Sequence, residues 1–167
     1  RSSLVGSEMC IRDRIYTFIS PEADALGSGW NIAQSKIAIG SGQFFGKGYM
    51  EGSQSQLDFI PESHTDFIFA VIVEEFGFLG ALGLFLLYAF LIHRLLYVAK
   101  SSNSKFAKLV SATLSIILAA YITLNISMVV GIFPVVGMPL PFISQGGTAL
   151  VVNMITIGII LSLRRTT

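Results

Sequence analysis

The sequence predicts an all-α fold, as a fragment of a polytopic membrane protein with about three transmembrane helices and a long extracytoplasmic region. Hydrophobic residues make up 53% of the chain and charged residues only 13%, with a mean hydropathy of +0.71. A soluble domain carries roughly a quarter charged residues. In addition, no charged residue occurs from Leu109 to Leu163. The bilayer is therefore the expected solvent. The single cysteine, Cys10, allows no internal disulfide.

The first stretch, "RSSLVGSEMCIRDR" at positions 1–14, is expected to be a non-native leader. It shows no usable periodicity and no apolar core long enough for a signal peptide. It also looks like leader sequence found at the ends of translated environmental reads, although Arg12 to Arg14 could already be native. The chain is then the C-terminal part of a longer protein.

Positions 15–66 are predicted to form an extracytoplasmic region with interfacial helices, because the stretch 20–66 is too polar to span and too rich in glycine for a compact core. One short amphipathic segment within it has an apolar side made of Trp30, Ile32, Ile37 and Ile39. A helix lying flat on the bilayer and a helix that binds substrate both fit this pattern. The glycines at 40, 42, 46 and 48 form no P-loop or dinucleotide-binding pattern.

The transmembrane helices are predicted within 67–167, at about 67–99, 109–130 and 146–163. The first contains the charge-free run "FGFLGALGLFLLYAFLI". At about 1.5 Å per residue, a helix from Phe76 to Ala99 can cross a hydrocarbon core about 30 Å thick. The last two are separated by "GIFPVVGMPLPFISQGG", whose three prolines and four glycines indicate a turn or re-entrant loop.

The charges are segregated along the chain. All ten acidic residues lie at or before Glu75, and six basic residues follow Phe76. Four of them lie around the connection between the first two predicted spans: Arg94, Lys100, Lys105 and Lys108. The other two, Arg164 and Arg165, follow the third span. Two crossings separate the two clusters, so both belong to one side, which the positive-inside rule makes cytoplasmic. The polar region before residue 67 and the proline-rich loop then face the extracytoplasmic side.

The stretch "FIPESHTDFIF" places Glu62, His64 and Asp66 at the edge of the most apolar segment. One explanation is structural, since Ser63 or Thr65 could cap a helix that begins near Asp66, and an acidic first turn is stabilised by the helix dipole. A lone interfacial histidine is also more often structural.

The other explanation is a reaction site. Asp66, Ala70 and Glu74 would share one helical face. Two carboxylates at membrane depth are costly unless they reach water, a cation or a substrate. No His/Cys metal-ligand spacing and no nucleophile motif occurs in the sequence.

A long stretch of the chain resembles a known family. "WNIAQSKIAIGSGQFFGKGYMEGSQSQLDFIPESHTDFIFAVIVEEFG" is similar to the central signature of the SEDS family, and to its RodA branch more than to FtsW or SpoVE. "GIFPVVGMPLPFISQGGTAL" looks like that family's last outer loop and final span. The resemblance runs from about Ile15 to Arg165, and one departure is Gln145, where the family usually shows tyrosine.

The resemblance implies a multi-pass peptidoglycan glycosyltransferase of the bacterial inner membrane, which polymerises lipid II into glycan strands during cell elongation and shape maintenance. The acid of the family's "HTDF" motif is regarded as catalytic and maps onto Asp66. The acid of its "QLEF" motif maps onto Asp58, which is expected to have a supporting role. The other supporting candidates are Glu62, His64 and Glu74, and the candidate substrate contacts are Gln34, Ser35, Lys36, Lys47, Gln54 and Gln56.

Two roles for Asp66 stay open. It could act as the general base on the acceptor hydroxyl, or hold a divalent cation, Mg²⁺ or Mn²⁺, that neutralises the pyrophosphate; no other cofactor is expected. Lys36 and Lys47 could contact the lipid pyrophosphate or be ordinary interfacial lysines. The implied partners are lipid II, polyprenyl-pyrophosphate-linked glycan, membrane lipids and a class B penicillin-binding protein, with no nucleic acid. The alternatives are a lipid-precursor flippase or transporter, and a non-catalytic scaffold for a transpeptidase.

The charge pattern leads to a test of topology. A cysteine at position 53 should react with a membrane-impermeant reagent from outside, and a cysteine at position 103 only after permeabilisation. The reason is that the basic clusters flanking position 103 are held on the cytoplasmic side. The reverse labelling pattern would show that the chain is inverted and that Asp66 faces the cytoplasm.

Overall fold

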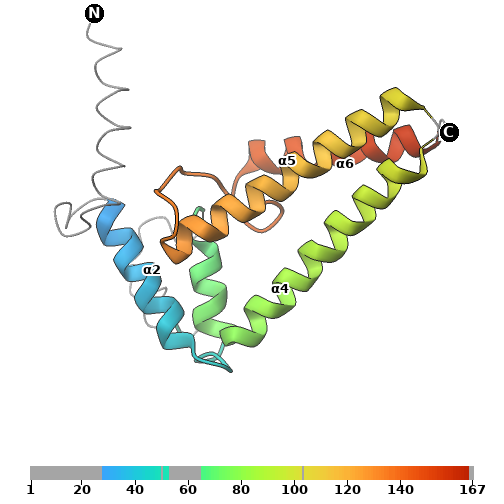
Figure 1. The fold of residues 1–167 in the computed structure, drawn as a ribbon. Coiled ribbons are helices and arrows are strands. Elements are labelled where there is room, and N and C mark those ends of the chain that lie inside the picture. Colours follow the sequence, from blue (N-terminus) through green and yellow to red (C-terminus); the bar gives the residue numbers. More distant parts are fainter. Residues whose placement is uncertain (1–27, 50, 53–64, 103, 166–167) are drawn as a thin grey trace, which may run out of the picture.

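The computed structural model describes residues 28–49, 51–52, 65–102 and 104–165. Within these ranges all regular structure is helical, in the order α2 (Ser28–Gly42), α4 (Ile68–Ser101), α5 (Lys105–Val130) and α6 (Gly147–Arg165). The predicted all-α fold class is confirmed (Figure 1). The spans predicted at 67–99, 109–130 and 146–163 correspond to α4, α5 and α6. The leader predicted at 1–14 lies outside the described residues.

The helices α4 and α5 are long and apolar enough to cross a membrane, and the apolar part of α6, Gly147–Leu163, is shorter. Their surfaces carry large apolar side chains that are about half exposed or more, among them Phe85, Leu87, Phe90, Leu109 and Ile116. Soluble monomers rarely expose contiguous apolar area of this kind. These faces therefore suit contact with lipid or with further helices.

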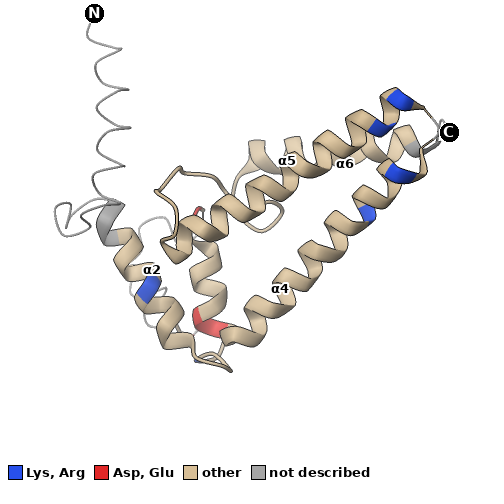
Figure 2. Ribbon diagram, in the orientation of Figure 1, with Lys and Arg blue, Asp and Glu red and all other residues tan. Residues whose placement is uncertain are grey.

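The apolar core follows α4 and α5 along their length, as far as Leu95 and Val98 near the end of α4, and it includes Ile160 of α6. At one end of the molecule α2, the first part of α4 and the end of α5 converge (Figure 1). The buried core members there come from these three helices and from the loop before α6: Ala38, Phe67, Phe69, Val73, Ile122, Ile126, Met128, Val129 and Leu140. Figure 2 shows acidic residues in the first part of α4, at this end. The lysines and arginines of α4 and α5 lie at the opposite end, where these two helices are joined.

Small residues allow α2 to pack closely against its neighbours. Ser35 and Ala38 are fully buried, and a Cβ atom built on Gly42 would lie 2.0 Å from the carbonyl oxygen of Val73 in α4. Such small-residue spacing lets helix backbones approach one another in a membrane. The apolar side predicted for this helix is only partly buried, because Ile32 is buried but Ile37 is 52% exposed. The predicted amphipathic helix exists, but its buried face differs from the predicted one.

The helix α4 is broken at Gly77, whose φ of 67° and ψ of −161° are not helical. A break removes the bonds that Phe78 and Leu79 would donate to the carbonyls four residues earlier. The segment 43–48 supplies replacements on both sides of the break. The N–H groups of Phe78 and Leu79 donate to the carbonyls of Gln43 and Phe44, at 2.9 and 3.3 Å.

In return, the segment 43–48 donates to the carbonyls that the break leaves open. Its Lys47 and Gly48 N–H groups bond the carbonyls of Glu74 and Glu75, at 3.0 and 3.1 Å. Four backbone hydrogen bonds thus replace the interrupted helical ladder. We call this arrangement, residues 43–48 with residues 74–79, the helix-break clasp.

The helix-break clasp demands glycine at Gly77. Its positive φ disfavours other residues, and a Cβ atom there would lie 2.3 Å from the backbone nitrogen of Gly46. Gly77→Ala should therefore lower the free energy of unfolding of the full-length protein by more than about 1 kcal/mol. Gly83→Ala is the matched control in the same helix, because nothing lies within 4 Å of its added Cβ atom.

Thermal unfolding in detergent measures both variants. Gly83→Ala should be neutral or slightly stabilising, since alanine is the better helix former. Equal stability of the two variants would contradict the role given to the break.

Candidate functional site

Asp66 lies in the turn at residues 65–67 that leads into α4, and its side chain is half-buried. The helix begins at Ile68, with Phe67 in the N-cap position and no side-chain cap. The prediction that Thr65 caps a helix starting near Asp66 is therefore wrong, and Ser63 lies outside the described residues. Asp66 is instead positioned by contacts with α5 and with the loop that follows it.

The contact with α5 comes from Asn125, which is fully buried. Its side-chain Nδ2 donates to the backbone carbonyl of Asp66 at 3.0 Å and also to the carbonyl of Met138. One amide group thus joins the start of α4, the body of α5 and the loop at 131–146. The two acceptors lie 59 and 13 residues from Asn125 in the sequence.

The loop at 131–146 brings its backbone next to the Asp66 carboxylate. A Cβ atom built on Gly137 would lie 3.5 Å from Oδ2 of Asp66, and Gly137 has a positive φ of 72°. A second side chain anchors the same loop, since the hydroxyl of Tyr88 in α4 donates to the carbonyl of Pro141 at 2.6 Å. The proline-rich loop is thus held against the candidate site by residues of two helices.

Glu74 lies inside the helix-break clasp. It is 0% exposed and forms an ion pair with Lys47, at 2.9 Å between Oε1 and Nζ. The Lys47 side chain is 31% exposed. The structure thus shows a charged partner for Glu74 in the segment 43–48, and a chemical role shared by Asp66 and Glu74 stays a prediction.

The remaining candidates on α2 have distinct surroundings. The buried Ser35 hydroxyl lies 2.9 Å from the carbonyl of Ile32 and 3.0 Å from that of Val129, so it links α2 to the end of α5. Gln34 is also buried. Lys36 is exposed, and its side chain lies against Gly131, the C-cap of α5, where a cation is favoured by the helix dipole.

Several predicted residues lie outside the described part of the chain: Gln54, Gln56, Asp58, Glu62 and His64. Among the residues that are described, no group of three or more His, Cys, Asp or Glu side chains could hold a metal ion. A cation at Asp66 stays a proposal for that reason. Gln145, the departure from the family pattern, is exposed.

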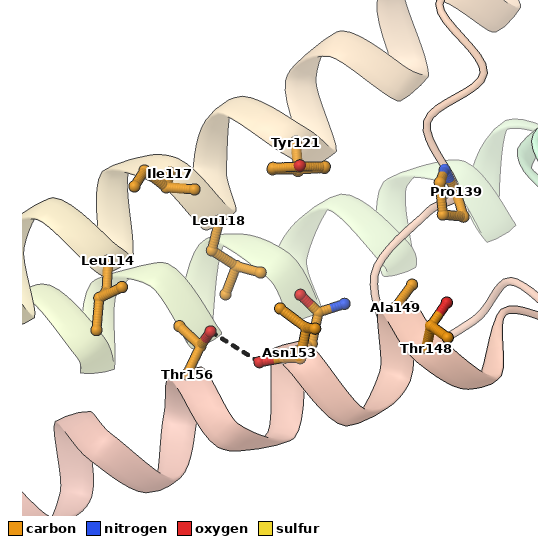
Figure 3. A pocket seen from close by; sticks show the side chains of 10 residues that line it. Leu114, Ile117, Leu118, Tyr121, Pro139, Thr148, Ala149, Asn153 and Thr156 are labelled. Atoms are coloured by element: carbon orange, nitrogen blue, oxygen red, sulfur yellow. Dashed lines mark hydrogen bonds between the residues drawn. The ribbon is translucent and has the colours of Figure 1, made fainter.

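A separate groove of about 450 Å³ lies between α5 and α6 (Figure 3). It is mostly apolar, and its polar lining comes from Tyr121, Thr148, Asn153 and Thr156. The Thr156 hydroxyl is satisfied within α6 by the carbonyl of Val152 at 2.8 Å. The described residues that line this groove include no carboxylate, and their mostly apolar side chains suit binding of an apolar group.

Sequence reasoning missed Asn125 and the helix-break clasp. A signal for Asn125 was present, since it is the only amide between Lys108 and Gly131 in an otherwise apolar helix. A polar residue in such a position needs a partner and often marks function. The sequence contains no comparable signal for the four backbone hydrogen bonds of the helix-break clasp, because these bonds depend on which segment packs against Gly77.

The Lys47–Glu74 pair can be tested by a double-mutant cycle in the full-length protein. Lys47→Met should lower the free energy of unfolding by at least about 1 kcal/mol, because it leaves the buried Glu74 carboxylate without its countercharge. Adding Glu74→Gln should recover part of that loss. The control, Lys36→Met, removes an exposed lysine of α2 and should change stability by less than about 0.5 kcal/mol. Additive effects of the first two changes would show that the pair is not coupled.

The chain has clear relatives. The sequence model of the FTSW_RODA_SPOVE family, described as cell cycle protein, matches residues 3–167. The peptidoglycan glycosyltransferase MrdB of Escherichia coli strain K12 is 51% identical over 152 residues, which are 91% of this chain and 41% of the relative. The peptidoglycan glycosyltransferase RodA of Treponema pallidum is 39% identical over 150 residues, which are 90% and 35% of the two chains.

Solved structures share the fold. A chain from the structure described as "Structural coordination of polymerization and crosslinking by a peptidoglycan synthase complex" matches with a TM-score of 0.75 and 27% identity, over 93% of this chain and 41% of that one. An aspartate-to-alanine mutant of the rod shape determining protein RodA from Thermus thermophilus matches with a TM-score of 0.59 and 33% identity, over 62% and 35%. The chain thus spans about two-fifths of the length of these relatives. It belongs to the FtsW, RodA and SpoVE family of cell cycle proteins.

Proposed function

We propose that the full-length protein is a peptidoglycan glycosyltransferase, which polymerises lipid II into glycan strands during cell elongation and shape maintenance. The observation that carries this proposal is the position of Asp66. Its half-buried side chain lies where α4, α5 and the loop at 131–146 meet, near the end of α5 that is far from the basic first turn of that helix. The relatives MrdB and RodA, both peptidoglycan glycosyltransferases, support the same activity.

The opposition of charges supports a site on the extracytoplasmic face of the bacterial inner membrane. The basic residues Arg94, Lys100, Lys105 and Lys108 mark the cytoplasmic end under the positive-inside rule. Asp66 lies at the other end of α5, since its carbonyl accepts from Asn125, five residues before this helix ends at Val130. A lipid-linked sugar whose head group lies at the outer interface would meet this carboxylate there.

In this proposal Asp66 is the general base. The 4-hydroxyl of the acceptor sugar transfers its proton to the carboxylate while its oxygen attacks the anomeric carbon of the donor. The new glycosidic C–O bond forms as the bond between that carbon and the pyrophosphate oxygen breaks, and polyprenyl pyrophosphate leaves. General-base catalysis of this kind contributes about 10²–10⁴-fold to the rate.

The alternative role, in which Asp66 holds a divalent cation against the pyrophosphate, uses the same carboxylate. Among the described residues, no group of three or more His, Cys, Asp or Glu side chains could hold a metal ion. The proposal uses the general base because this role needs a single carboxylate.

A class B penicillin-binding protein is the proposed partner, because its transpeptidase would crosslink the strands that the polymerase makes. The structural relative whose description joins polymerization and crosslinking in one peptidoglycan synthase complex supports such a pairing. We expect polymerisation from the full-length protein rather than from these residues alone, since they span about two-fifths of the relatives.

The decisive variant is Asp66→Asn in the full-length protein. Asparagine keeps the size and polarity of the side chain but cannot accept the proton, so polymerisation of lipid II in vitro should fall at least about 100-fold. Membrane abundance should stay normal, because the backbone carbonyl that Asn125 bonds is unchanged.

Three control variants accompany it. Gln145→Tyr alters an exposed position and should keep most of the rate, and Glu62→Gln and His64→Asn should lose much less than Asp66→Asn. A normal rate of polymerisation in Asp66→Asn would show that Asp66 is not the general base. If the unmodified protein transports lipid without glycan growth, it is a flippase. If it shows neither transport nor glycan growth, it is a scaffold.

A further inference from the structure

Asn125 is an unusual residue for its place in α5. It is fully buried in a helix whose buried neighbours, Leu118, Ile122 and Ile126, are apolar. A buried amide is costly unless its polar atoms are bonded. Its two amide protons are used, but its Oδ1 has no hydrogen-bond partner among the described residues. An apolar residue of the same shape would therefore serve helix packing at least as well.

The two bonds that Asn125 does make are both directed to the candidate site. One acceptor is the backbone carbonyl of Asp66 itself, and the other is the carbonyl of Met138. Met138 follows Gly137, whose backbone lies next to Oδ2 of Asp66. The same amide thus bonds the backbone of Asp66 and the backbone of the residue that follows Gly137 in the loop.

The loop has a second anchor that does not reach Asp66. The Tyr88 hydroxyl bonds the carbonyl of Pro141, three residues beyond Met138. Removing this bond should loosen the loop while leaving the Asp66 contact with Asn125 in place. Tyr88 and Asn125 therefore offer a comparison between holding the loop and positioning the carboxylate.

We propose that Asn125 is a positioning residue for Asp66. Through its paired bonds to the Asp66 and Met138 carbonyls, it holds the carboxylate at the distance and angle that proton abstraction from the acceptor hydroxyl requires. This inference rests on the proposed glycosyltransferase function. Misplacement of a reacting group by about 1 Å can cost about 100-fold in rate. Asn125 can therefore affect the rate through the position of Asp66, without touching the substrate.

The test is the steady-state polymerisation of lipid II by the full-length protein and its variants. Asn125→Leu keeps the shape of the side chain but removes both donors. It should lower kcat at least about 10-fold while KM for lipid II stays within about threefold, because the lost interaction acts on the transition state. The comparison variant, Tyr88→Phe, should lower kcat less than Asn125→Leu does, because it releases the loop at Pro141 but leaves the Asn125 bond to the Asp66 carbonyl in place.

A double variant separates positioning from general destabilisation. In the Asp66→Asn background, Asn125→Leu should cause little further loss of rate, because residues that act as a unit are not additive. Full multiplication of the two losses would overturn the inference. Thermal unfolding in detergent, measured alongside, should show Asn125→Leu no less stable than Tyr88→Phe.

If Asn125→Leu is not recovered from membranes, the variant Asn125→Gln tests the inference instead. Glutamine keeps the amide but displaces it by one methylene, so kcat should fall while KM and thermal stability remain near those of the unmodified protein. An unchanged kcat in Asn125→Gln or in Asn125→Leu, together with a large loss in Asp66→Asn, would overturn this inference and leave the proposed function standing. An unmodified protein with no polymerase activity would overturn both.

Discussion

Backbone polar groups inside a bilayer have no water to bond, so a broken helix can exist at membrane depth only where other protein groups replace its lost hydrogen bonds. The break at Gly77 has such replacements. The segment 43–48 accepts from the two N–H groups beyond the break and donates to the two carbonyls before it. Because of this exchange, the first part of α4 can turn away from the rest of the helix and run beside α2 (Figure 1). The turn of α4 determines where Asp66 lies.

The helix-break clasp explains residues that otherwise look like substrate contacts. Gly42 and Gly46 approach the backbone of α4 so closely that a Cβ atom on either would lie about 2 Å from a carbonyl oxygen. Lys47 extends from the same segment to the fully buried Glu74. The glycines and the lysine of this stretch thus contact the break and the acid beside it. Asp66 lies at the other end of the short first part of α4.

The surroundings of Asp66 come from three parts of the chain that are distant in sequence. The turn before α4 supplies the carboxylate, α5 supplies the amide of Asn125, and the loop at 131–146 supplies the backbone beside it. The loop stays in place because Asn125 and Tyr88 bond two of its carbonyls. In the proposed function this arrangement positions Asp66 as the general base, and the exposed apolar faces of α4 and α5 suit contact with lipid or with further helices. It connects the stability of the fold to the geometry of the proposed reaction.

The sequence by itself determined the helical membrane class, the helices α4, α5 and α6, and the choice of Asp66, because apolar runs, proline-rich interruptions and a motif are local properties of the chain. It also placed a helix around Ile32, although the buried face of α2 contains Ser35 and Ala38 rather than Ile37. Only the tertiary structure decided that Glu74 pairs with Lys47, that Gly77 breaks α4, and that Asn125 bonds the Asp66 backbone. Each of these depends on which distant segment lies alongside, and helical periodicity says which side of a helix is apolar but not which partner covers it.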